Sequence, residues 1–100
     1  MILRTLTIAA ALSIGVAATP AAATGKMTCD APQAQWKSLD SLEASLKKQG
    51  WEVRKSKVDG GCYEVYGTDP EGNRVEAYFH PVSFKKLLVS RRGEVLFRAK

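Results

Sequence analysis

One stretch, residues 38–81, constrains the fold of this chain more than any other. An amphipathic segment comes first, and short alternating segments separated by turn signals follow it. Leu39, Leu42 and Leu46 recur at i, i+3 and i+7, the spacing that places side chains on one stripe of a helix. This order of elements predicts an α+β fold in two layers, with one α-helix packed on a three- to four-stranded antiparallel β-sheet.

The sequence also marks both ends of this helix. Ser38 is a favourable N-cap residue, and Asp40 places a negative charge in the first turn. Gly50 suits the left-handed position that ends a helix, and Trp51 is then expected to pack on Leu46. The predicted helix therefore begins just after Ser38 and ends just before Gly50.

Three predicted strands follow the helix, over residues 51–58, 62–68 and 74–80. An Asp-Gly pair precedes the second strand, and Pro and Gly precede the third; both are typical turn signals. If the first hairpin has a three-residue loop, alternation places one set of side chains towards the helix: Trp51, Val53, Tyr63, Val65, Val75, Ala77 and Phe79. The opposite face is expected to be exposed to water and to carry Glu52, Arg54, Glu64, Tyr66, Arg74, Glu76, Tyr78 and His80.

Residues 84–100 are expected to form an additional strand and a basic C-terminal tail. The apolar run 87–89 is interpreted as a short fourth strand, and the run 95–97 as a weak edge or a flexible end. A helix over residues 83–92 is the alternative. The positive charge of this tail could attract an anionic surface weakly, whereas nucleic acid is not an expected partner of an exported protein.

The first 23 residues have the layout of a secretory signal peptide. Arg4 is followed by an apolar run over residues 6–18 and then by small residues that end at Ala23. The run of ~13 residues is shorter than the ~20 that a membrane-spanning helix needs, so an uncleaved anchor is the less favoured alternative. We therefore expect a periplasmic or secreted protein in which residues 24–37 form an N-terminal arm.

The chain has two cysteines, Cys29 and Cys62. An exported compartment is oxidising, so a disulfide between them is the simplest interpretation. It would close a loop of ~33 residues and contribute ~3 kcal/mol in the chain-entropy model. The sequence contains no CxxC motif, which gives a thioredoxin-like redox role little support.

The run from Gly50 to Pro81 resembles a PepSY domain of the small, secreted, single-domain kind. The features that carry the resemblance are a short helix ending in Gly50-Trp51, the strand residues Tyr63-Glu64-Val65, the turn over residues 69–72, and Val75-Glu76 leading to His80-Pro81. Many relatives have Asp where this chain has His80. The Thr-Gly that usually follows the proline is replaced by Ser83-Phe84.

This resemblance implies that residues 38–83 form a PepSY-like domain, with a helix packed on three or four strands. PepSY domains occur in protease propeptides, where they are thought to inhibit or to assist folding, and as stand-alone exported proteins. The family carries no established catalytic residue. The resemblance therefore implies no enzymatic activity and no cofactor.

Seven residues of the face expected to be exposed form a candidate interaction face: Arg54, Glu64, Tyr66, Arg74, Glu76, Tyr78 and His80. Tyrosine and arginine are favoured anchors at protein interfaces. The leading hypothesis is an exported, non-enzymatic binding or regulatory module that acts on a protease or a membrane-associated partner through this face. Neither a catalytic residue nor a metal site is expected.

Two further hypotheses come from other classes of protein. A periplasmic redox, metal or haem accessory protein would use His80 or the cysteines, although one histidine falls short of the about four ligands of a zinc site. An enzyme would use Glu64 and Glu76 as an acid–base pair, which requires a desolvated cleft. A cross-strand network of these two carboxylates with Arg54 and Arg74 is the structural interpretation of the same residues.

Overall fold

The computed structural model describes residues 26–100, so the predicted signal peptide lies outside the described residues. The described elements, in chain order, are η1 (Gln33–Gln35), α1 (Leu39–Lys48), β1 (Glu52–Asp59), β2 (Cys62–Thr68), β3 (Arg74–Phe79), β4 (Lys86–Arg91) and β5 (Glu94–Arg98). Within this part of the chain, no helix has the length and apolarity required to cross a membrane.

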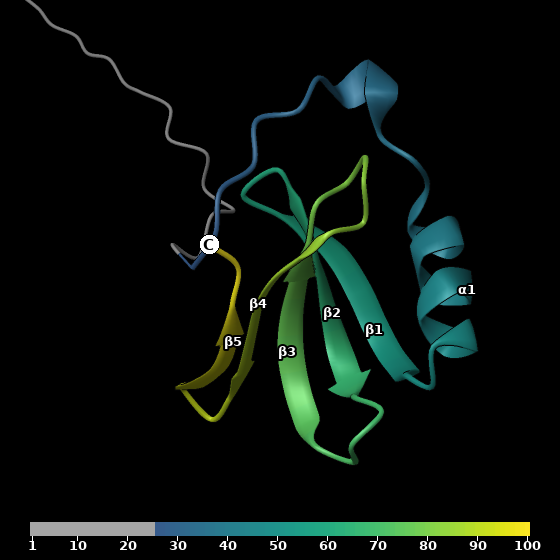
Figure 1. Cartoon of the computed structure of the whole chain (residues 1–100). Helices are drawn as coiled ribbons and strands as arrows, with labels where there is room; N and C mark the ends of the chain where they lie inside the picture. The colour runs from purple at the N-terminus through teal and green to yellow at the C-terminus, as the bar shows by residue number, and fades with distance from the viewer. Residues whose placement is uncertain (1–25) are drawn as a thin grey trace, which may run out of the picture.

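The strands of residues 26–100 form one antiparallel sheet in the order β1-β2-β3-β4-β5, and α1 packs on one face of it near β1 (Figure 1). The α+β prediction is confirmed, but the prediction of three to four strands is wrong, because there are five. Residues 94–98 fold back onto β4 through a two-residue turn in which Arg92 and Gly93 have φ values of 51° and 84°. The predicted basic tail is therefore a strand, and residues 86–91 pair with β3 and β5 instead of forming a helix.

The ends of α1 follow the prediction. The Ser41 backbone N–H donates to the Ser38 side-chain oxygen at 3.0 Å, which caps the first turn. At the other end, the Trp51 N–H donates to the Leu46 carbonyl at 3.0 Å while Gly50 has a φ of 99°. This is the Schellman arrangement, and it turns the chain directly from α1 into β1.

The first hairpin has a two-residue loop, where three residues had been expected. Gly60 and Gly61 have φ values of 65° and 80°, both in the left-handed region that this tight turn requires. A β-bulge at Arg54, between Val53 and Lys55, adds the residue that restores the side-chain alternation. Val53 therefore still lies towards α1, as predicted.

The face of the sheet that α1 covers, called here the helix face, holds the main apolar core. Its buried members, together with those of α1, are Leu42, Leu46, Trp51, Tyr63, Val65, Val75, Ala77, Phe79 and Val89. The Trp51 and Phe79 rings meet edge to face at 5.7 Å between centroids. Burial of each large apolar side chain contributes about 1.5–3 kcal/mol, so this layer supplies most of the hydrophobic stabilisation.

The opposite face, called here the arm face, is not open to water as predicted. Tyr78 is 0% exposed and Glu64 is 2% exposed, so both residues of the candidate interaction face are buried. The segment before α1 crosses this side of the molecule, from the α1 side towards β5 (Figure 1). Met27 and Cys29 pack there against a second cluster formed by Cys62, Tyr78 and Leu88.

A disulfide and a tight backbone approach hold this arm in place. The predicted Cys29–Cys62 bond is present, and the Cys29 N–H donates to the Gly60 carbonyl at 2.8 Å. A Cβ at Gly61 would lie 2.3 Å from the Cys29 carbonyl oxygen, so this turn position needs glycine for space as well as for its φ. The arm and the first hairpin are therefore fitted to one another.

Candidate functional site

The arm covers two acidic side chains on the arm face. Asp59 is 1% exposed and accepts a hydrogen bond from the Tyr78 hydroxyl at 2.8 Å. The Lys57 Nζ atom lies 3.7 Å from the Glu64 Oε1 atom and forms an ion pair with it. Within the described part of the chain, this Oε1 atom accepts no hydrogen bond. Both carboxyl groups belong to the interior of the protein and offer no contact surface to a partner.

Glu64 and Glu76 do not form the open pair that acid–base catalysis would use. In the register of β2 and β3, Glu64 lies opposite Tyr78, and Tyr66 lies opposite Glu76, so the two carboxylates are diagonal neighbours. Glu76 binds Lys26 at 2.7 Å, and this hydrogen bond is the main reason why the pKa of Lys26 is raised. The ion pairs of these two carboxylates are thus made by lysines instead of the arginines that the sequence suggested.

His80 has a structural role in the turn after β3. Its Nδ1 atom accepts backbone N–H groups from Val82 at 3.1 Å and Ser83 at 3.3 Å. An aspartate carboxylate at this position could accept the same kind of hydrogen bonds. Residues 26–100 hold no group of three or more side chains that could bind a metal ion, and both cysteines are in the disulfide.

Tyr66 is the tyrosine of the candidate interaction face that remains partly exposed. The ammonium groups of Lys55 and Lys57 lie 5.2 and 5.8 Å from its ring centroid. Burial raises the pKa of Tyr66 to about 12, helped by a hydrogen bond to Glu64 and by nearby carboxylates. The hydroxyl therefore stays protonated near neutral pH, beside a group of cations.

We call this area the basic surface; it consists of Tyr66 with Arg54, Lys55, Lys57 and Arg74 from β1 and β3. Arg54 owes its place to the bulge in β1, while Arg74 lies opposite Thr68 at the start of β3. Within the described residues, the arm meets the rim of this area at Glu76, which Lys26 binds. Of the seven predicted interaction residues, the structure brings Arg54, Tyr66, Arg74 and Glu76 together around one cavity.

Two arginines that the sequence analysis did not single out complete this end of the molecule. Arg91 ends β4 and Arg92 begins the following turn. Together with Arg54 and Arg74 they form what we call the arginine recess. It comprises a cavity of 160 Å³ and an adjacent one of 540 Å³, both lined by Arg74, Arg91 and Arg92.

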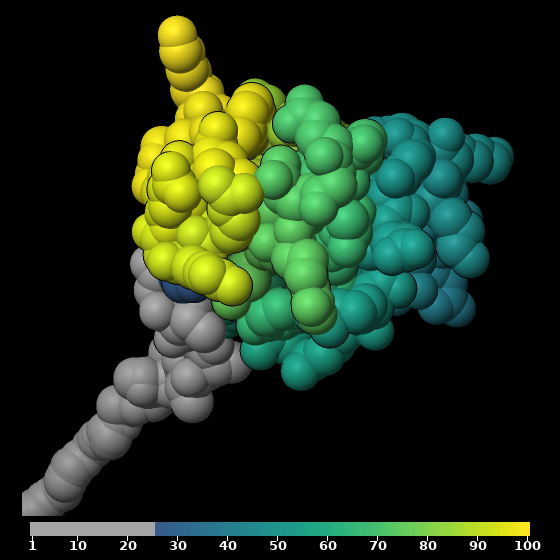
Figure 2. Space-filling model, turned by 90° about the horizontal axis from the view of Figure 1, so that it is seen from below, coloured from purple at the N-terminus to yellow at the C-terminus, as the bar shows by residue number. Residues whose placement is uncertain are grey.

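Figure 2 views the molecule from this end, where the green β2–β3 turn lies beside the yellow β4–β5 turn. A hydrogen bond of 2.8 Å from Arg91 to the Asn73 side chain joins the two turns. The Arg-Arg-Gly sequence between two apolar runs was the available signal for this site. It was interpreted as part of a basic tail, because residues 95–97 were expected to form only a weak edge or a flexible end.

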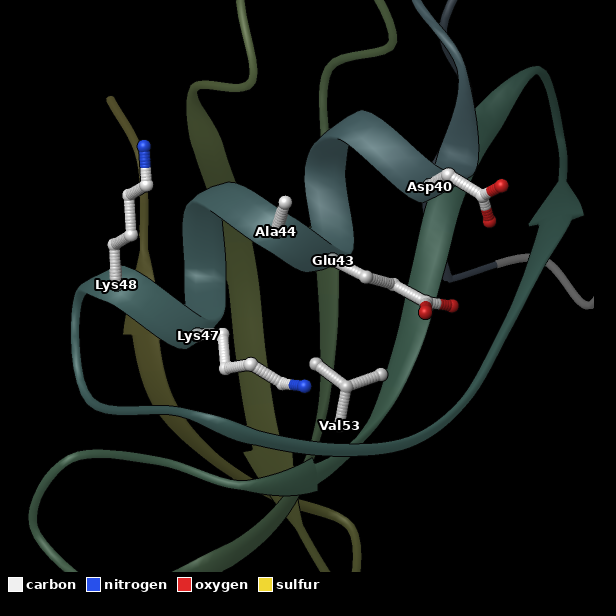
Figure 3. Close-up of a pocket in the computed structure, with 6 residues that line it drawn as sticks. All are labelled: Asp40, Glu43, Ala44, Lys47, Lys48 and Val53. Carbon is white, nitrogen blue, oxygen red and sulfur yellow. The ribbon is translucent and has the colours of Figure 1, made fainter.

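A larger groove of 610 Å³ lies between α1 and the edge strand β1. In Figure 3, Glu43 and Lys47 extend from α1 towards Val53, while Asp40, Ala44 and Lys48 point away from it. Glu43 accepts a hydrogen bond from the Ser56 hydroxyl, so its carboxylate connects the helix to the sheet. The groove presents mixed surface charges of a helix flank and gathers no set of groups for a chemical reaction.

The comparison with protein families agrees with this architecture. The family model described as "peptidase propeptide and YPEB domain" matches residues 6–88, which is most of the chain, and the protein therefore belongs to the PepSY family. PepSY domains typically occur in exported proteins and are generally inhibitory or propeptide modules rather than catalytic ones. The match ends within β4, so Arg91, Arg92 and β5 lie beyond it.

The two other comparisons add no relative. No curated protein matches the chain, and no solved structure matches it.

Proposed function

We propose that this protein is an exported, non-enzymatic binding module that regulates a protease or a membrane-associated partner through the basic surface. The observation that supports the proposal is the position of Tyr66, partly exposed between cations from β1 and β3. Membership of a family of propeptide-like modules favours a protease over other partners.

The chemistry of the basic surface suits protein binding. Tyrosine and arginine are enriched among residues that carry most of the energy of an interface. The Tyr66 hydroxyl donates its hydrogen bond to Glu64, which leaves its ring and the lone pairs of its oxygen for contact with a partner. Arg54 and Arg74 are fixed at their backbones by a sheet whose arm face is closed by a disulfide, which lowers the entropy lost on binding.

The test is capture of a partner from the exported fraction with the disulfide-bonded protein, followed by identification of the captured protein. Tyr66→Ala is expected to abolish the capture. Phe97→Ala is the matched control, since it removes another partly exposed aromatic side chain, from β5, and should leave capture unchanged. A captured protease is then assayed with increasing amounts of each variant.

Two outcomes would contradict the proposal. Capture of the same partner by wild type and by Tyr66→Ala would exclude the basic surface as the contact. A captured protease whose activity is insensitive to the wild-type protein at saturation would exclude the regulatory role for that partner.

A further inference from the structure

We infer that the arginine recess binds an acidic, extended segment of the partner protein, an inference that rests on the proposed function. Arginines from β1, β3, β4 and the β4–β5 turn line the recess, and Glu76 and Glu94 are the acidic residues that line it. Guanidinium groups bind carboxylates through two parallel hydrogen bonds, which makes them well suited to Asp and Glu side chains. The ligand class is therefore a peptide segment that carries several carboxylates.

The arginines of the recess are largely available for such a ligand. Within residues 26–100, Arg54, Arg74 and Arg92 make no ion pair with an acidic side chain. Arg91 is the exception, because it donates to Asn73 and lies 3.6 Å from Glu94. Arg54, Arg74 and Arg92 line one cavity together with Glu76, whose carboxylate is bound by Lys26, so a bound anionic segment would lower the repulsion among the arginines.

The backbone at Arg92 gives independent support. Its φ of 51° is in the left-handed region, where an arginine is disfavoured and where two-residue hairpin turns usually have Asn, Asp or Gly. The other two-residue hairpin of the sheet has glycine at both positions, Gly60 and Gly61. The backbone conformation alone therefore favours Asn, Asp or Gly over Arg at position 92. Arg92 lines both cavities of the recess.

The surroundings favour a peptide over a membrane surface. Exposed acidic residues flank the recess at this end of the molecule: Glu71 in the β2–β3 turn, and Glu94 at the start of β5. A flat anionic bilayer would have to meet these carboxylates together with the arginines, whereas a single extended chain can enter the recess between them. The two turns carry Gly72 and Gly93, and the exposed large apolar side chains that follow them, Val95, Leu96 and Phe97, belong to β5.

The experiment measures binding of a fluorescein-labelled hexaglutamate peptide to the purified, disulfide-bonded protein by fluorescence anisotropy at low and at physiological salt. Arg54→Gln/Arg74→Gln should weaken binding at least about fivefold at low salt. Lys47→Gln/Lys48→Gln, on the exposed flank of α1, removes the same net charge and should change the affinity less than about twofold. A hexaglutamine peptide should not bind.

Arg92→Gly separates the role of the side chain from the integrity of the fold. Glycine accepts the left-handed backbone, so the Tm of this variant should equal or exceed that of wild type. Its affinity for hexaglutamate should nevertheless fall about two- to fivefold. A weaker peptide complex in a protein of undiminished stability is the result that the inference requires.

Three results would overturn the inference. The first is an equal loss of affinity in the Lys47→Gln/Lys48→Gln control, which would show a response to net charge alone. The second is arginine-dependent binding to phosphatidylglycerol vesicles without binding to the peptide, which would make the recess a lipid site. The third is unchanged partner capture by Arg54→Gln/Arg74→Gln while Tyr66→Ala abolishes capture. This result would still support the proposed function but would contradict binding of an acidic segment in the arginine recess.

Discussion

The two faces of the sheet are both covered, but by different means. On the helix face, α1 lays Leu42 and Leu46 onto a continuous apolar layer. On the arm face, Asp59, Glu64 and Tyr78 are buried under a segment whose one regular element is a single turn of 3-10 helix. An apolar cover is held by the hydrophobic effect along its whole length, whereas an irregular cover over polar groups gains less from burial and is fixed here by a disulfide.

This difference also locates the surface that is left for binding. The disulfide anchors the arm at the hairpin end of the arm face, beside Gly60 and Gly61. Towards the opposite end of the same strands, the arm is held by the Lys26–Glu76 ion pair, and Tyr66 and the arginines lie around the cavity that Glu76 also lines. The arm, which covers the buried polar groups, therefore sets the boundary of the basic surface.

The largest expected effect concerns the helix face. Leu42→Ala removes a fully buried side chain from the centre of the contact between α1 and the sheet and should lower the free energy of unfolding by about 2–5 kcal/mol. Urea denaturation measures the loss. Leu39→Ala, at the half-buried edge of the same stripe, is the matched control and should lose clearly less. Equal losses would mean that α1 does not pack through its central leucines.

The next effect concerns the arm face. Replacing both cysteines, Cys29→Ser/Cys62→Ser, should lower the free energy of unfolding by ~3 kcal/mol, because the closed loop spans 33 residues. Loss of the covalent attachment should also expose Tyr78, while the helix face stays folded. Tyrosine iodination with peptide mapping measures this exposure. Protection of Tyr78 equal to wild type would show that the arm remains docked without the disulfide.

A smaller loss of unfolding free energy is expected when either of two buried tyrosines, one on each face of the sheet, is replaced by phenylalanine. Tyr78 donates to the Asp59 carboxyl group on the arm face, and Tyr63 donates to the Lys37 backbone carbonyl on the helix face. Tyr78→Phe removes a donor from a buried carboxyl oxygen and should cost about 1–3 kcal/mol, whereas Tyr63→Phe should cost about 0.5–1.5 kcal/mol, the usual value of a single hydrogen bond. Urea denaturation of the two variants tests the order, and the reverse order would contradict a specific polar interior on the arm face.

The smallest effect is a titration at high pH. The pKa of Tyr66 is raised to about 12 by burial and by its carboxylate neighbours, above its ordinary value of 10.0. The unfolded chain therefore loses this proton first, and the stabilisation that Tyr66 gives is complete below pH 10.0 and is lost as the pH rises towards about 12. The difference in tyrosinate absorbance between wild type and Tyr66→Phe should have its midpoint near 12. A midpoint near 10.0 would place Tyr66 in open solvent.

Much of the helix face could be predicted from local signals. The cap at Ser38, the stop at Gly50-Trp51 and the strand over residues 62–68 depend on neighbouring residues alone. The side-chain alternation was also predicted correctly, although the hairpin loop was given one residue too many. The bulge at Arg54 compensated for that error, since either arrangement leaves Val53 on the same side of the sheet.

The candidate site could be predicted only in part. Arg54, Tyr66, Arg74 and Glu76 were identified from their alternation and do surround one cavity. Glu64 and Tyr78 share the same alternation but are buried, because a segment more than 30 residues earlier in the chain lies over them. Arg91 and Arg92 were not assigned to a site, because an arginine in the left-handed region is not a usual turn signal and residues 95–97 were expected to be a weak edge or a flexible end.

The sequence by itself determined the helix, the first three strands, the apolar side of the sheet and the Cys29–Cys62 disulfide, because periodicity, capping and cysteine number act locally or by count. Only the tertiary structure decided what lies over the polar side, where the fifth strand pairs, and which arginines meet. These features depend on contacts between segments far apart in the chain, and side-chain alternation says which way a residue points but not what covers it.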